Sequence, residues 1–175
     1  KISLPEVGHY AGGMVFLPND ITRSSIAQKA VEQAISDEGQ IFIGWRDVPT
    51  DDTVLGNSVI NNKPIIKQFF IQRSSKCKDE NHFQRKLYVI RKTVHKKIHQ
   101  SNLLEWEDFY IVSLSTRTIV FKGMVLAPNL SKFYVDFQDN KFETAIALFH
   151  QRFSTNTFPS WRLAQPFRYL CHNEI

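Results

Sequence analysis

Cysteine is scarce in this 175-residue sequence: only Cys77 and Cys171 are present, and they lie far apart in the chain. Two cysteines at that separation provide neither a disulfide framework nor the paired spacing of a zinc site. We therefore interpret both as unpaired thiols of a reduced, intracellular protein. Long apolar runs are missing too, since none approaches the roughly 18 residues that span a bilayer. We expect no membrane segment.

The start of the chain also lacks familiar signals. The first ten residues, KISLPEVGHY, contain neither an initiating methionine nor an apolar signal region. We expect no secretory signal, and a chain that is processed, trimmed or part of something longer.

Several short catalytic motifs are absent as well. The glycines of GHYAGG do not have the spacing of a phosphate-binding loop, and there is no GxSxG nucleophile elbow. No histidine pair stands beside a cysteine at ligand spacing. The sequence therefore gives no reason to expect a metal or a bound cofactor within this chain.

The net charge of +5 is concentrated in one stretch. Between Lys76 and His99 eight lysines and arginines face two acids, whereas the rest of the chain holds 14 against 15. Apolar residues in the same stretch recur at helical spacing, which predicts an amphipathic helix whose basic residues mostly occupy the solvated face. That stripe consists of Phe83, Leu87, Ile90, Val94 and Ile98. A nucleic-acid-binding module that uses residues 76–97 is the less favoured alternative, so we expect no nucleic-acid partner.

The remaining periodicity predicts an α+β domain with a largely antiparallel sheet. A second helix is predicted between Asn19 or Asp20, as its N-terminal cap, and Gly39, just past its end. Strand-like segments of β-branched and aromatic residues surround the two helices. They lie at residues 10–17, 40–49, 64–72, 109–115, 118–125, 133–137, 144–153 and 165–170.

Three residues near the C-terminus point to a carboxylate-binding site. Arg152 ends a predicted strand, where its guanidinium can offer a planar fork to a carboxylate, and Thr155 can add a hydroxyl. Asn173 ends a further apolar run, and a side-chain amide is a common oxyanion donor. From these residues alone, a small-carboxylate site and a structural role for the same groups remain equally open.

Five segments together resemble a known family, in order from about Gly8 to Ile175. They are GMVFLP, GWRDVP, KLYVIRK, SLSTRTIVFKGM and HQRFSTNTFPSWRLAQPFRYLCHN. The sequence is similar to the glutaminase domain of glutamate synthases, a class II glutamine amidotransferase. The resemblance implies an Ntn-hydrolase-like αββα sandwich, of which residues 1–175 would be the internal part of a single domain.

The resemblance also implies a chemistry. An N-terminal cysteine attacks the carboxamide of L-glutamine and releases ammonia, which a synthase domain of the same polypeptide uses to aminate 2-oxoglutarate reductively. FMN and an iron–sulfur cluster serve that domain, with ferredoxin or a nicotinamide-linked small subunit as electron donor. By the family motifs, Arg152 and Thr155 bind the substrate carboxylate and Asn173 donates to the oxyanion. The expected compartment is the cytoplasm or the plastid stroma.

The sequence departs from the family pattern in three places. The nucleophilic cysteine is outside this chain, since neither Cys77 nor Cys171 aligns with it. The family motif HNGEI is HNEI here, so Asn173 is followed directly by Glu174. The acidic residue that binds the substrate amino group would fall beyond Ile175. We expect the isolated chain to be inactive, and a non-catalytic relative that binds glutamine or a partner remains the alternative.

Overall fold

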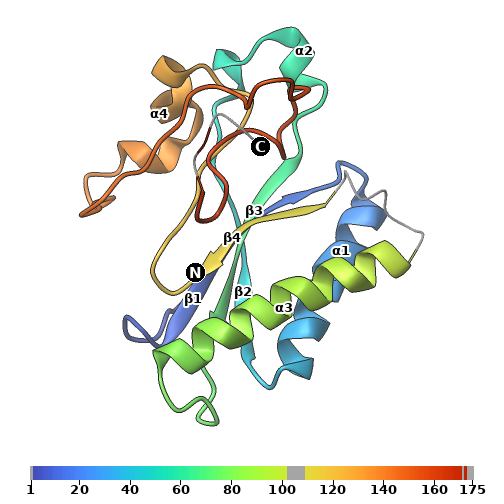
Figure 1. Cartoon of the computed structure of the whole chain (residues 1–175), viewed down its shortest axis with the longest axis vertical. Coiled ribbons are helices and arrows are strands. Elements are labelled where there is room, and N and C mark those ends of the chain that lie inside the picture. The colour runs from blue at the N-terminus through green and yellow to red at the C-terminus, as the bar shows by residue number, and fades with distance from the viewer. Residues whose placement is uncertain (1, 102–108, 171, 173–175) are drawn as a thin grey trace. The chain divides into compact units, whose positions relative to one another are not determined.

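The computed structural model describes residues 2–101, 109–170 and 172. They belong to two compact units (Figure 1). The sheet unit comprises Lys1–Arg46 and Ile65–Ile119, and the loop unit comprises Asp47–Pro64 and Val120–Ile175. That the two units together make up one domain stays a prediction.

The sheet unit contains four strands and two long helices: β1 (Tyr10–Leu17), α1 (Ile21–Asp37), β2 (Ile41–Asp47), β3 (Ile65–Gln72), α3 (Glu80–Gln100) and β4 (Tyr110–Ser115). The strand order is β2-β3-β1-β4, and β1 pairs antiparallel with both β3 and β4. The antiparallel sheet and these six elements confirm the expectation from periodicity.

The first helix, α1, begins and ends where the sequence predicts. The Asp20 carboxylate accepts the backbone N–H of Arg23 at 2.7 Å, and Gly39, just past the C-terminal cap, has a φ of +67°. Such a φ suits glycine, which carries no Cβ. In α3 the Asp79 carboxylate accepts the N–H of His82 at 2.6 Å.

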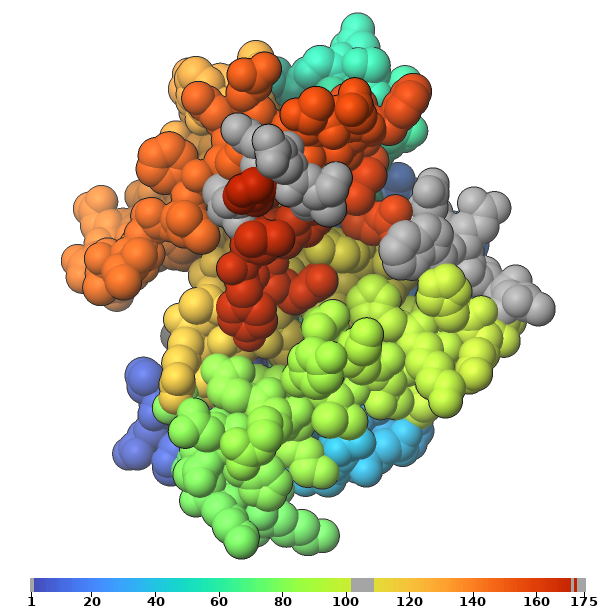
Figure 2. Space-filling model, in the orientation of Figure 1, coloured from blue at the N-terminus to red at the C-terminus, as the bar shows by residue number. Residues whose placement is uncertain are grey.

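The basic residues of α3 lie on its solvated face. All five residues of the apolar stripe are buried, whereas no lysine or arginine of the helix is. The green surface of Figure 2 is this outward face. Lys86 and Lys97 also pair with the end of α1, through Glu38 at 2.8 Å and Asp37 at 2.6 Å. The cluster of positive charge therefore has a structural explanation.

Both helices cover the same face of the sheet (Figure 1) and share one apolar core with it. At its centre Gly13 pairs with Phe69 across the strands, and the aromatic ring lies over the glycine. A Cβ at position 13 would lie 2.3 Å from two ring atoms. Residues of the opposite face, such as Met14, Phe16 and Ile66, are also buried and apolar. The same face also carries the buried polar side chains of Gln68 and Ser113.

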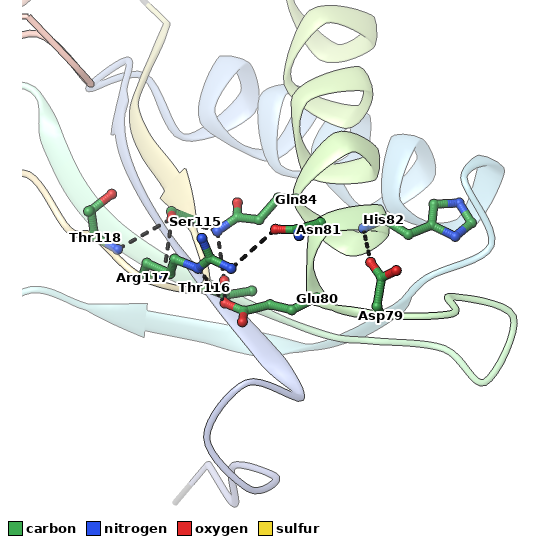
Figure 3. Close-up of polar contacts among 9 residues, drawn as sticks. All are labelled: Asp79, Glu80, Asn81, His82, Gln84, Ser115, Thr116, Arg117 and Thr118. Atoms are coloured by element: carbon green, nitrogen blue, oxygen red, sulfur yellow. Dashed lines mark hydrogen bonds and ion pairs between the residues drawn. The ribbon is translucent and has the colours of Figure 1, made fainter.

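A polar network attaches the start of α3 to the end of β4 (Figure 3). The Glu80 carboxylate accepts from Arg117 Nε at 2.8 Å and from the Thr116 hydroxyl at 2.6 Å. These bonds lower the pKa of Glu80 to about 2. The Ser115 hydroxyl accepts the backbone N–H groups of Arg117 and Thr118. The backbone donors that would continue β4 are thereby bound locally, and the strand ends.

The loop unit differs from the expectation. Its elements are short: η1 (Asp52–Val54), α2 (Asn57–Ile60), η2 (Ala127–Asn129), α4 (Leu130–Phe133) and η3 (Val135–Gln138). The predicted strand at 133–137 is wrong, because α4 and η3 occupy it. The predicted strands at 118–125, 144–153 and 165–170 are also wrong, because none of these segments is helix or strand.

Side chains explain why apolar sequence forms no strands there. Aromatic rings pack edge-on instead of lining a pleat, as Phe121 does against Tyr134 at 5.0 Å and against Phe142 at 5.5 Å. Within 144–153, Ile146 and Phe149 are more than four-fifths exposed. Apolar composition alone therefore misidentifies these segments, because burial requires partners that composition does not reveal.

Candidate active site

The predicted carboxylate site lies on a turn rather than at a strand end. The Thr157 N–H donates to the Ser154 carbonyl at 3.1 Å, and Asn156 has a φ of +61°. Arg152 and Thr155 are exposed on either side of buried Ser154. The backbone N–H of Arg152 donates to His150 Nδ1 at 3.1 Å, which orders the entry to the turn. Both predicted carboxylate ligands are thus accessible on one short segment.

Asn173, the predicted oxyanion donor, lies outside the described residues, as does Cys171. The other cysteine, Cys77, is a free thiol, as predicted, and the structure shows in addition that it is buried. His172, which precedes Asn173, is described, and its backbone has specific partners.

Two buried side chains bind that backbone. Gln165 Nε2 donates to the His172 carbonyl and, at 2.8 Å, to the Ser154 hydroxyl. Its Oε1 accepts the His172 N–H at 3.3 Å, and the Ser154 hydroxyl donates to the same carbonyl at 3.2 Å. The turn that carries Arg152 and the residue before Asn173 are therefore joined through one amide and one hydroxyl.

A buried lysine supports the segment that runs from the turn at residues 154–157 to His172. Lys122 is 2% exposed, donates to the Arg162 carbonyl at 2.6 Å and lies 4.6 Å from the centre of the Phe167 ring. Burial, together with the positive charges of Arg168 and Arg162, lowers the pKa of Lys122 to about 7. Its ammonium ion is therefore costly to keep at this position.

Two further contacts fix the same region. The buried Tyr134 hydroxyl donates to the Lys122 carbonyl at 2.7 Å, and burial raises the pKa of that hydroxyl. A Cβ at Gly123 would lie 2.4 Å from Trp161, so only a glycine lets this indole approach without displacement. The result is a tightly packed support beneath residues 161–167.

Sequence reasoning missed Ser154, Gln165 and Lys122. All three lie within segments that carry the family resemblance, and a glutamine or lysine among aromatic residues is unusual enough to notice. The hydrogen-bond partners of Gln165 and Lys122, however, lie 7 and 40 residues away in the chain, and no local pattern reveals them.

The family model of class-II glutamine amidotransferases matches residues 1–175, the whole chain. The chain belongs to this family. The predicted fold class, an Ntn-hydrolase-like domain of mixed α and β structure, is thereby confirmed. Of the four layers implied, the described residues form one antiparallel sheet and one helical layer.

Curated relatives of this amidotransferase chain include glutamate synthases. It is 44% identical over 173 residues to the glutamate synthase (NADPH) large chain of Bacillus subtilis, and 39% identical over 173 residues to ferredoxin-dependent glutamate synthase 2 of Synechocystis. Each match covers 99% of this chain and 11% of the relative. The chloroplastic/mitochondrial ferredoxin-dependent glutamate synthase 1 of Arabidopsis thaliana is 37% identical over 94% of this chain and 10% of its own length. The chain thus spans about a tenth of these relatives.

Two further properties concern the described residues only. None of their helices combines the length and apolarity needed to cross a membrane. Nor do they bring together three or more His, Cys, Asp or Glu side chains that could hold a metal ion. The residues described here do not fit an iron–sulfur cluster.

Proposed function

We propose that this amidotransferase chain is the glutamine-hydrolysing part of a glutamate synthase. The observation that carries the proposal is the match of the whole chain to the family, together with the three relatives described above, each of which is named a glutamate synthase. The exposed pair Arg152 and Thr155 on one ordered turn supports it, because glutamine needs a fixed cation at its carboxylate.

The reaction divides between this chain and residues outside it. A cysteine thiolate from outside attacks the carboxamide carbon of L-glutamine, and the carbonyl electrons move to oxygen. Asn173 donates to that oxyanion while Arg152 and Thr155 hold the carboxylate at the other end. As the intermediate collapses, the C–N bond breaks while its nitrogen takes up one proton, so ammonia leaves and a glutamyl thioester remains. Water then attacks the thioester, which releases glutamate and returns the cysteine thiol.

The ammonia then passes to the synthase domain of the same polypeptide, where 2-oxoglutarate is reductively aminated. FMN and an iron–sulfur cluster, for which no residue of this chain is assigned, would supply the electron chemistry there, with ferredoxin or a nicotinamide-linked small subunit as the electron donor. The names of the relatives support both types of donor. The compartment is the cytoplasm or, as the names of the plant relatives suggest, the plastid stroma.

Two variants of the full-length protein test the proposal by separating binding from chemistry. Arg152→Ala should raise KM for glutamine by on the order of 10–100-fold, since a hydrogen-bonded charge is lost. Asn173→Ala should lower kcat by about 10²–10³-fold with a smaller change in KM. Arg85→Ala, which removes an exposed arginine of α3, is the matched control.

The readout is ammonia released from glutamine. If glutamine binds in an Arg152-dependent manner but no ammonia is released, the chain belongs instead to a non-catalytic glutamine-binding relative. If neither variant differs from the control, the assignment of these residues is wrong.

A further inference from the structure

A buried amide–hydroxyl pair lies between the two halves of the proposed glutamine site. Ser154 and Gln165 are 5% and 6% exposed. Burial of such groups is costly unless their hydrogen bonds are made, and here each bonds to the other and to His172. The pair is therefore a specific connection rather than a solvated surface contact.

The backbone around this pair forms a tight reversal. The Phe167 N–H donates to the Leu170 carbonyl at 2.8 Å, and the Leu170 N–H returns to the Phe167 carbonyl at 3.3 Å. In an antiparallel hairpin, the next two residues to exchange a pair of main-chain hydrogen bonds would be residues 165 and 172. The Gln165 side chain makes those two bonds, one to the N–H and one to the carbonyl of His172. An amide side chain thus takes the place of a main-chain partner.

No regular secondary structure supplies this alignment. From residue 139 onward, the described residues include no helix or strand, so the chain near residue 172 depends on individual side-chain bonds. In the chain, His172 directly precedes Asn173. At the other end, Ser154 lies between Arg152 and Thr155 in the chain.

We propose that Gln165 is a positioning residue: through its bonds to Ser154 and the His172 backbone, it aligns the oxyanion donor with the carboxylate-binding turn. This inference rests on the proposed function, because it takes Asn173 as the donor and Arg152 as the carboxylate ligand. The connection matters because a donor must be held within a fraction of an ångström of the developing oxyanion to stabilise it.

The experiment is a double-mutant cycle on glutamine hydrolysis by the full-length protein. Gln165→Leu should lower kcat on the order of 10–100-fold and change KM much less. A misplaced oxyanion donor stabilises the transition state less well, and the loss in kcat is at most that of removing the donor. In an Asn173→Ala background the same substitution should lower kcat no further, because there is no donor left to align. A merely structural role would give losses that multiply.

Two additional variants keep the test decisive if Gln165→Leu does not fold, as judged by its thermal unfolding. Ser154→Ala removes one bond to the His172 carbonyl and should lower kcat several-fold, again without effect in the Asn173→Ala background. Ser160→Ala is its matched control, since it removes a hydroxyl of the same kind that accepts the nearby Leu163 N–H at 3.3 Å.

The outcomes separate the two proposals. If Asn173→Ala lowers kcat but Gln165→Leu and Ser154→Ala do not, or if the losses multiply, the positioning role is wrong and the proposed function stands. If Asn173→Ala itself leaves kcat unchanged, both the oxyanion assignment and the positioning role are overturned.

Discussion

In the sheet unit, β1 pairs with β3 at eight positions and with β4 at five, whereas the loop unit has one isolated bridge among its described residues, between Thr50 and Tyr134. The first unit is held by a backbone ladder over a continuous apolar core. The second is held by side chains that bind carbonyl groups, as Lys122, Tyr134 and Gln165 do. All three proposed site residues belong to the second unit. The scaffold and the chemistry thus depend on different kinds of contact.

At constant pH, the largest effect of a single substitution should come from filling the space above Gly13. Gly13→Ala should lower the free energy of unfolding by about 3 kcal/mol, because the fully buried Phe69 ring has nowhere to move. Urea unfolding measures the change. Gly12→Ala is the matched control, since its Cβ would meet Phe70 at an ordinary 3.8 Å. Equal losses from both variants would contradict this account.

The corresponding substitution in the loop unit should cost less. Gly123→Ala places a Cβ 2.4 Å from Trp161, yet this indole is held by loops that can shift more readily than a sheet. We expect a loss of about 1–2 kcal/mol in the same urea experiment. Gly56→Ala, with nothing within 4 Å of its Cβ, is the control. A loss above that of Gly13→Ala would show that the loop unit is the more rigid of the two.

The buried lysine of the loop unit should make stability depend on pH on the alkaline side. The pKa of Lys122 is about 7 in the folded protein and 10.5 ordinarily, so between these values only the unfolded chain binds the proton. The free energy of unfolding therefore rises with pH by up to about 1.4 kcal/mol per pH unit. Lys122→Met should remove this slope, as measured by unfolding between pH 7 and 10.

The control for that experiment is Lys92→Met, which changes an exposed lysine of α3. If Lys122→Met keeps the full slope, the buried ammonium is not its source.

The smallest effect should come from the sheet unit and lie on the acid side. Hydrogen bonds from Arg117 and Thr116 lower the pKa of Glu80 from 4.5 to about 2. The contribution of the Glu80 carboxylate to the free energy of unfolding is therefore complete above pH 4.5 and is lost as pH falls toward 2. Glu80→Gln should flatten this part of the thermal unfolding profile slightly, because the pair is exposed. Glu6→Gln serves as the control, and an identical profile for both would contradict the role of the network.

The same contrast explains which sequence predictions succeeded. Periodicity located α1, α3 and the strands of the sheet unit, because a buried helix face or pleat leaves a repeat in the sequence. It failed in the loop unit, where apolar segments at 118–125, 133–137, 144–153 and 165–170 form no strands. Aromatic contacts and side-chain bonds to carbonyls have no period, so those segments resembled strands without being strands.

The candidate site shows the same division. Family motifs predict roles for Arg152, Thr155 and Asn173 from the residue type and its place in the motif. They did not identify Ser154 and Gln165, whose importance lies in partners 11 and 18 residues distant.

The sequence by itself therefore determined the family and the elements of the sheet unit, and it predicts the residues that would contact glutamine. All of these are encoded locally, as periodicity, caps or motif. Only the tertiary structure decided that Arg152 lies on a turn rather than at a strand end, and that a buried lysine and a glutamine amide support the segment around it. Such contacts join residues far apart in the chain, and their free energy depends on burial, which exists only once the chain has folded.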